Sequence, residues 1–186
     1  MGASKTVDQQ IINKEAIISK IRDIIRQYKN IAVSGEEGVG KITNTLEALQ
    51  DTPHVYYIGN PVDYIGKPRA KGYDKYIHYI MSLKKDMHII ADEEEIVSFD
   101  PAPLAGKDTV LVVDEIYGRS DQQYEKILEI LGTENIKVFI IAGCLKNISR
   151  IVHKIDIVLM LTKDGGLVVE SEFIRKVCTI LKADAS

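Results

Sequence analysis

Residues 30–43 of this 186-residue chain read NIAVSGEEGVGKIT, a mostly apolar run followed by a run rich in glycine. The apolar part, NIAVS, is typical of a strand that is buried on both faces. Gly35, Gly38 and Gly40 come next, and residues 41–50 then show the pattern of a helix. The stretch predicts a strand, a glycine-rich turn and a helix in direct succession, as in an α/β protein.

The spacing of glycine and lysine in this turn is typical of a loop that binds phosphate groups. Gly35, four further residues, Gly40 and Lys41 match that loop, in which the lysine reaches the outer phosphates. Glycines let consecutive backbone N–H groups point at phosphate oxygens, and the start of the next helix adds positive potential. The alternative is a simple strand-to-helix turn with a solvated lysine. We expect these residues to bind a nucleotide: Gly35, Glu36, Glu37, Gly38, Val39, Gly40, Lys41, Ile42 and Thr43.

Ile42 departs from the pattern, because Ser or Thr is usual at this position and its hydroxyl ligates Mg²⁺. Thr43 lies about 100° further around the helix, so its hydroxyl is expected to point elsewhere unless the loop is slipped by one residue. Backbone amides and Lys41 supply most of the binding to phosphate. We therefore expect phosphate binding to be kept and metal positioning, and with it hydrolysis, to be weakened.

A second apolar run, residues 109–113, ends in two acidic residues, Asp114 and Glu115. The carboxyl end of such a strand lies at the ligand crevice of an open α/β sheet. Asp114 is then placed to hold Mg²⁺, usually through water, and Glu115 to polarise an attacking water molecule as a catalytic residue. The alternative is a pair of solvated acids at the end of a strand.

The glycine-rich loop with Lys41, followed by the acidic pair, resembles the P-loop NTPases. It is most similar to their branch with a catalytic glutamate beside the metal-binding aspartate, which includes AAA+-like and RecA-like ATPases. The order of elements over residues 8–182 fits this branch. The resemblance implies an additional strand between the loop strand and the acidic strand, and a polar sensor after the strand at 138–142. Asn147 is the candidate for that sensor, because the tip of the strand itself carries none.

The resemblance implies that the chain binds ATP or ADP, with Mg²⁺, and is an ATPase impaired by Ile42. Two alternatives remain: a nucleotide-binding sensor or scaffold that does not hydrolyse, and a structural domain with an empty site. GTPases fit less well, because Tyr117 stands where their Asp-x-x-Gly motif needs glycine. The sequence Thr162-Lys163-Asp164 also lacks one residue of the motif that recognises guanine. Adenine is therefore the expected base.

Strands and helices alternate along the rest of the chain, and several of the strands are apolar throughout. This pattern predicts a three-layer α/β/α sandwich with a mainly parallel sheet of about five strands, P-loop NTPase-like. Residues 8–186 are expected to form a single domain after a flexible N-terminus, residues 1–7. The apolar runs predict strands at 30–34, 54–58, 87–91, 96–99, 109–113, 138–142, 157–161 and 167–169, and helices at 11–28, 41–50, 73–85, 122–131, 148–154 and 172–182.

Composition restricts the kinds of partner. The net charge of −3 gives no strong global attraction to nucleic acid or to an anionic membrane. The chain carries no apolar run long enough to span a bilayer, so we expect a cytoplasmic protein without a membrane partner. The basic loop within 59–72 offers only weak support for binding to nucleic acid.

Hydrolysis in P-loop proteins often uses an arginine from a second subunit or from a partner protein, which stabilises the transferred phosphate. A homo-oligomer or such a partner is therefore expected for an active enzyme. Arg119 and Arg150 are candidates for this arginine, and Arg175 is a candidate for a sensor arginine on the C-terminal helix, although each is more commonly an ordinary surface residue.

Overall fold

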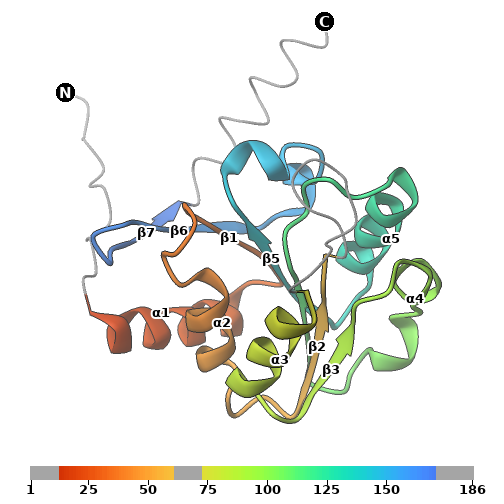
Figure 1. Ribbon diagram of the computed structural model, residues 1–186, viewed down its shortest axis with the longest axis horizontal. Helices are drawn as coiled ribbons and strands as arrows, with labels where there is room; N and C mark the ends of the chain where they lie inside the picture. The colour runs from red at the N-terminus through yellow and green to blue at the C-terminus, as the bar shows by residue number, and fades with distance from the viewer. Residues whose placement is uncertain (1–12, 61–72, 171–186) are drawn as a thin grey trace, which may run out of the picture.

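The computed structural model describes residues 13–60 and 73–170. They form one seven-stranded sheet in the order β3-β2-β4-β5-β1-β6-β7, in which every neighbouring pair is parallel except β6 with β7 (Figure 1). The predicted mainly parallel α/β sheet is confirmed, and it holds seven strands rather than about five, each at a position where the sequence predicts a strand. The strands are β1 (Asn30–Ser34), β2 (His54–Ile58), β3 (Met87–Ile90), β4 (Thr109–Val113), β5 (Lys137–Ala142), β6 (Ile157–Leu161) and β7 (Leu167–Glu170).

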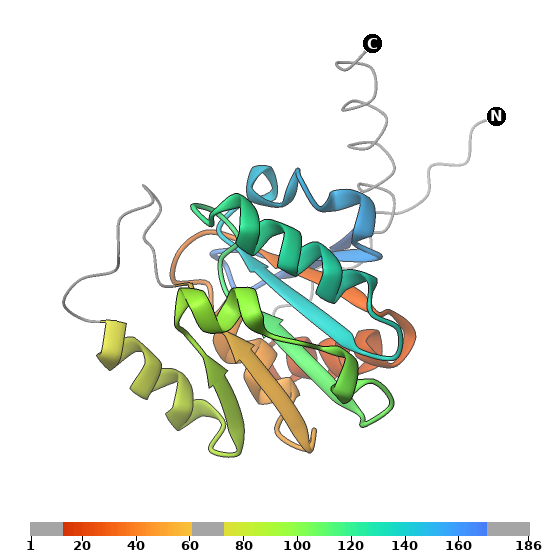
Figure 2. The same ribbon diagram turned by 90° about the vertical axis from the view of Figure 1, so that its right-hand side faces the viewer.

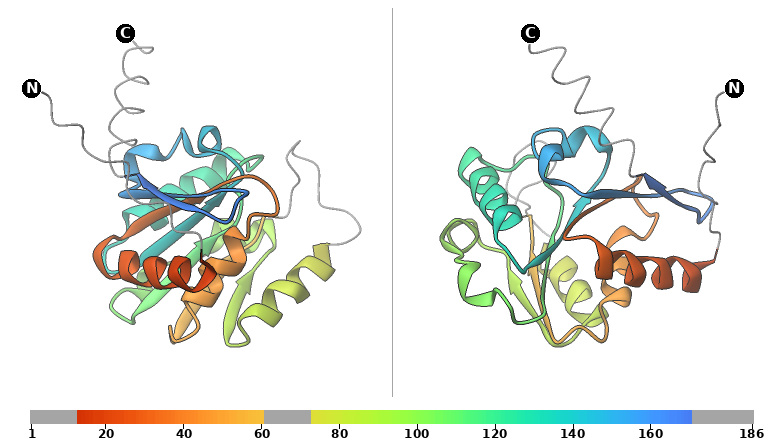
Figure 3. Two further views of the ribbon diagram at one scale, coloured as in Figure 1. Left: turned by 90° about the vertical axis from the view of Figure 1, so that its left-hand side faces the viewer. Right: turned by 180° about the vertical axis from the view of Figure 1, so that it is seen from behind.

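Helices cover both faces of this sheet, as the prediction of three layers requires. One face carries α1 (Lys14–Gln27), α2 (Lys41–Ala48) and α3 (Tyr73–Leu83), which stand in front of the sheet in the left view of Figure 3. The other face carries α4 (Glu93–Ser98) and α5 (Asp121–Gly132), which face the viewer in Figure 2. Each face has its own hydrophobic cluster, because successive residues of a buried strand point to opposite sides.

The helix α1 shows how the sequence pattern becomes packing. Ile17, Ile21 and Ile24 recur at helical spacing and are nearly completely buried against the sheet, while charged residues occupy the outer side. The side chain of Asn13 caps the helix by accepting a hydrogen bond from the backbone N–H of Glu15 (2.9 Å). Neither α1 nor any other helix within 13–60 and 73–170 has the length and apolarity needed to cross a membrane.

Two sequence predictions about local structure are wrong. The residues expected to form a strand at 96–99 instead belong to the end of α4 and its C-cap, and the first turn of this helix is acidic. Asp92 caps this helix by accepting hydrogen bonds from the N–H groups of Glu94 and Glu95, and carboxylates are favourable near a helix N-terminus.

The single helix expected at 148–154 is replaced by two short 3₁₀ segments, η2 (Leu145–Ile148) and η3 (Val152–Lys154). Ile148 and Ile151, three residues apart, are both buried, and a spacing of three residues suits a 3₁₀ turn. A further 3₁₀ segment, η1 (Ala102–Leu104), precedes β4. The N-terminus 1–7, the loop 61–72 and the helix at 172–182 lie outside the described residues.

The strand order brings the two sequence motifs together. β5 lies between β1 and β4 and pairs in parallel with both, so the additional strand implied by the resemblance is present. The carboxyl ends of these parallel strands meet at one edge of the sheet. The loop after β1, the acidic pair after β4 and the segment after β5 therefore share this edge.

Candidate functional site

The glycine-rich loop between β1 and α2 depends on left-handed backbone at two of its glycines. Gly38 and Gly40 each have φ of 81°, in the region that glycine adopts without the strain a side chain would cause. Gly40 stands at the N-cap position of α2, so the loop leads directly into the first turn of that helix. The loop therefore lies at the positive end of this helix, which is the position that phosphate binding requires.

Lys41 is held inside this loop. Its ammonium donates hydrogen bonds to the carbonyl oxygens of Gly35 (2.7 Å) and Glu36 (2.8 Å). Partial burial lowers the pKa of Lys41, while the nearby negative charges of Glu115 and Asp114 act in the opposite direction. The ammonium therefore lies in the electric field of the acidic pair.

Two glutamates in the loop add negative charge where a phosphate would bind. Glu36 forms an ion pair with Lys163, which lies between β6 and β7. Glu37 is exposed, and its charge acts on Lys41. An anionic ligand would therefore meet repulsion from Glu37 that Lys163 does not cancel.

Replacing Glu37 with glutamine is expected to increase the affinity for inorganic tripolyphosphate about threefold. An exposed charge contributes up to ~1 kcal/mol, and removing it leaves the backbone of the loop unchanged. Isothermal calorimetry at low ionic strength measures the change, and the gain should shrink as salt is added. Glu134→Gln, an exposed substitution after α5, is the charge-matched control. An unchanged affinity in Glu37→Gln would show that phosphate does not approach this loop.

Asp114, at the end of β4, is buried and is bound by two tyrosines. Its Oδ2 accepts hydrogen bonds from the hydroxyls of Tyr57 in β2 (2.6 Å) and Tyr76 in α3 (2.8 Å). Burial, and next the charge of Asp114, raise the pKa of Tyr57 well above its usual value, so the phenol stays a neutral donor. Neither tyrosine could be recognised from the sequence, because each fits the regular pattern of its own strand or helix.

The surroundings of Asp114 do not fit a magnesium ion held by protein ligands. Ile42 offers no oxygen and packs against the hydrophobic cluster of its face. One carboxylate oxygen of Asp114 already has two hydroxyl donors. The described residues include no cluster of three or more His, Cys, Asp or Glu side chains that could hold a metal ion. The assignment of Asp114 as a metal ligand remains a prediction that this geometry does not favour.

Glu115 has an unusual backbone and a fully engaged carboxylate. Its φ of 34° is positive, which is uncommon for a residue with a side chain. Its Oε2 accepts a hydrogen bond from the backbone N–H of Gly143 (2.8 Å), after β5, and its Oε1 accepts from the amide of Asn147 (3.1 Å) and from the N–H of Tyr117 (3.2 Å). The structure thus brings Asn147 to the expected catalytic residue, and a role as sensor stays a prediction.

The arginines proposed from the sequence have structural partners. Arg119 is buried and donates to the carbonyl oxygens of Asp114 (2.6 Å) and Gly59 (3.0 Å). Arg150 lies over the ring of Tyr124, on the other face of the sheet, at 4.0 Å from its centroid and forms an ion pair with Asp121. Arg175 is outside the described residues. These contacts favour a structural role for Arg119 and Arg150 within their own chain.

Asn60 supports the same edge and was also missed from the sequence. Its amide donates to the carbonyl oxygens of Glu115 (2.9 Å) and Tyr117 (3.0 Å), which fixes the turn after β4. An asparagine just after an apolar strand is a usable signal for such a role, because that position lies at the functional edge of a parallel sheet.

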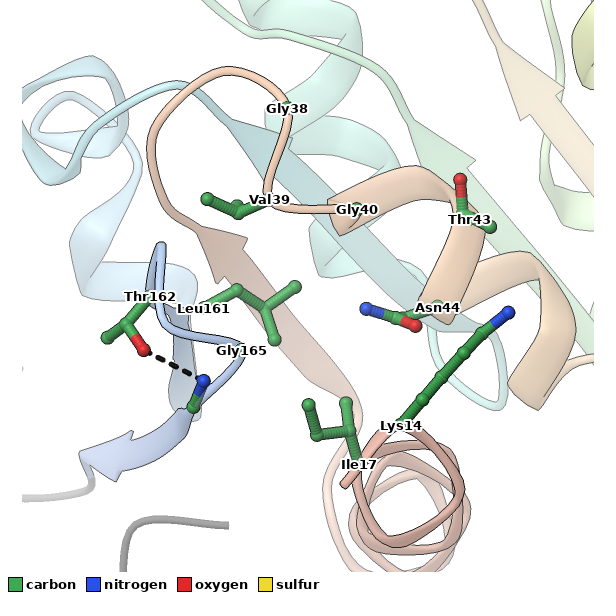
Figure 4. A pocket seen from close by; sticks show the side chains of 11 residues that line it. Lys14, Ile17, Gly38, Val39, Gly40, Thr43, Asn44, Leu161, Thr162 and Gly165 are labelled. Atoms are coloured by element: carbon green, nitrogen blue, oxygen red, sulfur yellow. Dashed lines mark hydrogen bonds between the residues drawn. The ribbon is translucent and has the colours of Figure 1, made fainter. Parts of the chain in front are cut away.

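A hollow of about 360 Å³ lies directly beside the glycine-rich loop (Figure 4). Its volume is within the range of pockets that bind small molecules. Its walls come from α1, from the loop and the start of α2, and from the turn between β6 and β7. The lining residues are Lys14, Ile17, Gly38, Val39, Gly40, Thr43, Asn44, Leu161, Thr162, Gly165 and Gly166.

No family model and no curated protein matches this sequence. Among solved structures, the chain resembles the assembled ATPase EscN, in complex with its central stalk EscO, from the type III secretion system of enteropathogenic E. coli. The TM-score is 0.48 at 14% identity, over 97% of this chain and 58% of that one. It also resembles a prototypical ATPase from the type III secretion system of pathogenic bacteria, with a TM-score of 0.48 at 12% identity, over 95% and 68% of the chains. The chain thus spans less than two thirds of the first protein.

Proposed function

We propose that this chain binds a nucleoside triphosphate, ATP or its product ADP, at the loop Gly35–Thr43. The observation that supports this best is the position of Lys41, whose ammonium is enclosed by the carbonyl groups of its own loop. A lysine in that position can exchange the carbonyl oxygens for phosphate oxygens without moving the backbone. Its charge is worth more there than in open solvent, because the site is partly buried.

In this proposal the nucleotide occupies two neighbouring spaces, one for its phosphates and one for its base. Backbone N–H groups of the loop and the first turn of α2 would bind the phosphates, together with Lys41. The hollow beside the loop would take the base, with Ile17 and Leu161 as apolar walls. Mg²⁺ would be carried by the phosphates of the nucleotide, since the surroundings of Asp114 do not fit a metal ligand.

Hydrolysis is a second candidate, and the position of Glu115 favours it. A carboxylate at the carboxyl end of β4, on the same edge as the loop, can accept a proton from a water molecule that attacks the outer phosphate. Before it can accept this proton, the carboxylate of Glu115 has to give up one of the hydrogen bonds that it accepts from N–H groups. We expect slow turnover for this reason and because Ile42 lacks the hydroxyl. Faster hydrolysis would need a second copy of the chain or a partner protein to supply an arginine.

Calorimetric titration of the protein with ATP, once with Mg²⁺ and once with EDTA, tests the proposed function. We expect binding in both conditions, with a small difference in affinity, and weaker binding of AMP because it lacks the outer phosphates. Absence of heat with ATP, ADP and inorganic tripolyphosphate in both conditions would contradict the proposal and favour a structural domain.

Replacing Ile42 with threonine tests whether the missing hydroxyl is what limits the binding of Mg²⁺. In the double variant Ile42→Thr/Tyr76→Phe, which also frees one bond to Asp114, we expect the affinity for ATP in Mg²⁺ to exceed that in EDTA by about tenfold. The rate of phosphate release, measured with a coupled assay, should rise in parallel. Ile42→Val/Tyr76→Phe is the control, because valine has the shape of threonine without its hydroxyl. Equal behaviour of the two double variants would mean that other parts of the machinery are absent.

A further inference from the structure

The side chain of Asn44 stands out among the residues that line the hollow beside the loop. Asn44 lies in α2, is only 7% exposed, and lines the hollow. Its backbone N–H bonds to Gly40, as in any helix, but its carboxamide has no hydrogen-bond partner among the described residues. Figure 4 shows this side chain extending toward the space between Ile17 and Leu161.

The other polar side chains around the hollow already have partners. The hydroxyl of Thr162 bonds to Asp164 and accepts from the N–H of Gly166. The hydroxyl of Thr43 bonds to that of Tyr79 (3.0 Å). The ammonium of Lys14 bonds to a glutamate of α2. Of the described side chains that line the hollow, Asn44 therefore has the free donor and acceptor.

A carboxamide that lines a hollow and has no partner in the protein can exchange water for a ligand that offers matching hydrogen bonds. The ligand that suits it offers one donor and one acceptor side by side, because a carboxamide presents an N–H₂ donor next to a C=O acceptor. The amide nitrogen of Asn44 is also close to the glycine-rich loop, so a ligand bound to it would lie next to that loop. A Cβ added to Gly40 would be 3.2 Å from Nδ2 of Asn44, so the hollow and the glycine-rich loop are contiguous.

We infer that Asn44 recognises the base of the bound nucleotide and that this base is adenine. The inference rests on the proposed function, since the phosphates must occupy the loop for the base to reach the hollow. Adenine carries an amino donor beside a ring-nitrogen acceptor, which is the edge that asparagine pairs with through two hydrogen bonds.

Guanine matches this single carboxamide less well. One of its edges presents two acceptors, O6 and N7, and would leave the oxygen of Asn44 without a donor. Its Watson–Crick edge can pair O6 and N1–H with the carboxamide, but the 2-amino group beside N1 is then left without an acceptor. The walls formed by Ile17 and Leu161 cannot compensate, because they are apolar. Asn44 therefore selects adenine over guanine by leaving the polar groups of guanine unpaired.

Calorimetric titration with ATP, GTP and inorganic tripolyphosphate tests this inference on the full chain and on two variants. Asn44→Leu keeps the size of the side chain and removes both hydrogen bonds, and Asn44→Asp keeps the acceptor and removes the donor. We expect the full chain to bind ATP about tenfold more tightly than GTP, and Asn44→Leu to lose that preference through weaker binding of ATP. Asn44→Asp should also lose it, and its binding of ATP should weaken further because of the added charge.

Tripolyphosphate separates this inference from the proposed function, because it occupies the loop without a base. Its affinity should be the same in the full chain and in Asn44→Leu, which also shows that the variant is folded. Gln122→Ala, an exposed change on the opposite face of the sheet, is the control and should keep the preference for ATP. If tripolyphosphate does not bind the full chain, the proposed function fails. If it binds while ATP and GTP bind equally, or while Asn44→Leu still prefers ATP, the assignment of Asn44 is overturned.

Discussion

Replacing Lys41 with alanine is expected to weaken the binding of ATP and of inorganic tripolyphosphate about 100-fold. The ammonium lies within the loop and carries the positive charge nearest to the expected phosphates. Charge-assisted hydrogen bonds are worth about 1.5–3 kcal/mol each, and loss of about 3 kcal/mol corresponds to two orders of magnitude in the dissociation constant. Isothermal calorimetry with both ligands measures the change.

Lys107→Ala is the control for Lys41→Ala, because it removes one exposed positive charge before β4, away from the loop. Its affinities should stay within about twofold of the unaltered chain, as for other surface charges. Thermal unfolding of both variants checks that the fold is kept. If Lys41→Ala bound tripolyphosphate as well as Lys107→Ala does, phosphate would not occupy this loop and the proposed function would be wrong.

The fold was predictable because its central strands carry their own signal. β4 and β5 are apolar at every position after the first, and β1 is apolar at its three central positions, which is what a strand covered by helices on both faces requires. The segment Glu93–Ser98 misled the prediction because its strand-like end is short, and a few residues do not separate the two periodicities. There the capping side chain of Asp92 and the acidic first turn were the better signals.

The site was predictable as far as it is encoded in neighbouring residues. Lys41, Asp114 and Glu115 were found because each stands at the end of an apolar strand or just after a glycine-rich turn. Tyr57 and Tyr76 could not be found, since the contact of their hydroxyls with Asp114 exists only after three elements have packed. Asn44 was missed for a different reason: a polar residue in the first turns of a helix is unremarkable until its burial is known.

Burial and hydrogen bonding at the sheet edge also change the weight of the two functional alternatives. Glu115 favours hydrolysis by its position, but three N–H donors hold its carboxylate. Asp114 is likewise engaged by two phenols. Both carboxylates are thus committed to partners within the chain, whereas Lys41 contacts carbonyl oxygens that phosphate oxygens could replace, and Asn44 lines the hollow. The geometry therefore supports nucleotide binding more directly than it supports turnover.

Replacing Gly35 with alanine is expected to destabilise the whole domain by about 4 kcal/mol, which lowers the melting temperature by about 10 °C. Gly35 has φ of 150°, and a Cβ added there would lie 2.4 Å from the carbonyl oxygen of Leu161. That oxygen belongs to the last residue of β6, which pairs with Leu167 of β7, so it cannot move without disturbing this edge of the sheet. Differential scanning calorimetry of the unliganded protein measures the loss.

Gly38→Ala is the matched comparison, because Gly38 also has positive φ, 81°, but a Cβ added there has no neighbour within 4 Å. It should cost only the conformational strain of a left-handed alanine, about 1 kcal/mol. The difference between the two variants isolates the contact of the loop with β6. Equal destabilisation would mean that strain alone sets the conformation of the loop. A much larger loss in Gly35→Ala would show that the sheet itself fixes the first residue of the loop, and so the place where Lys41 and the hollow meet.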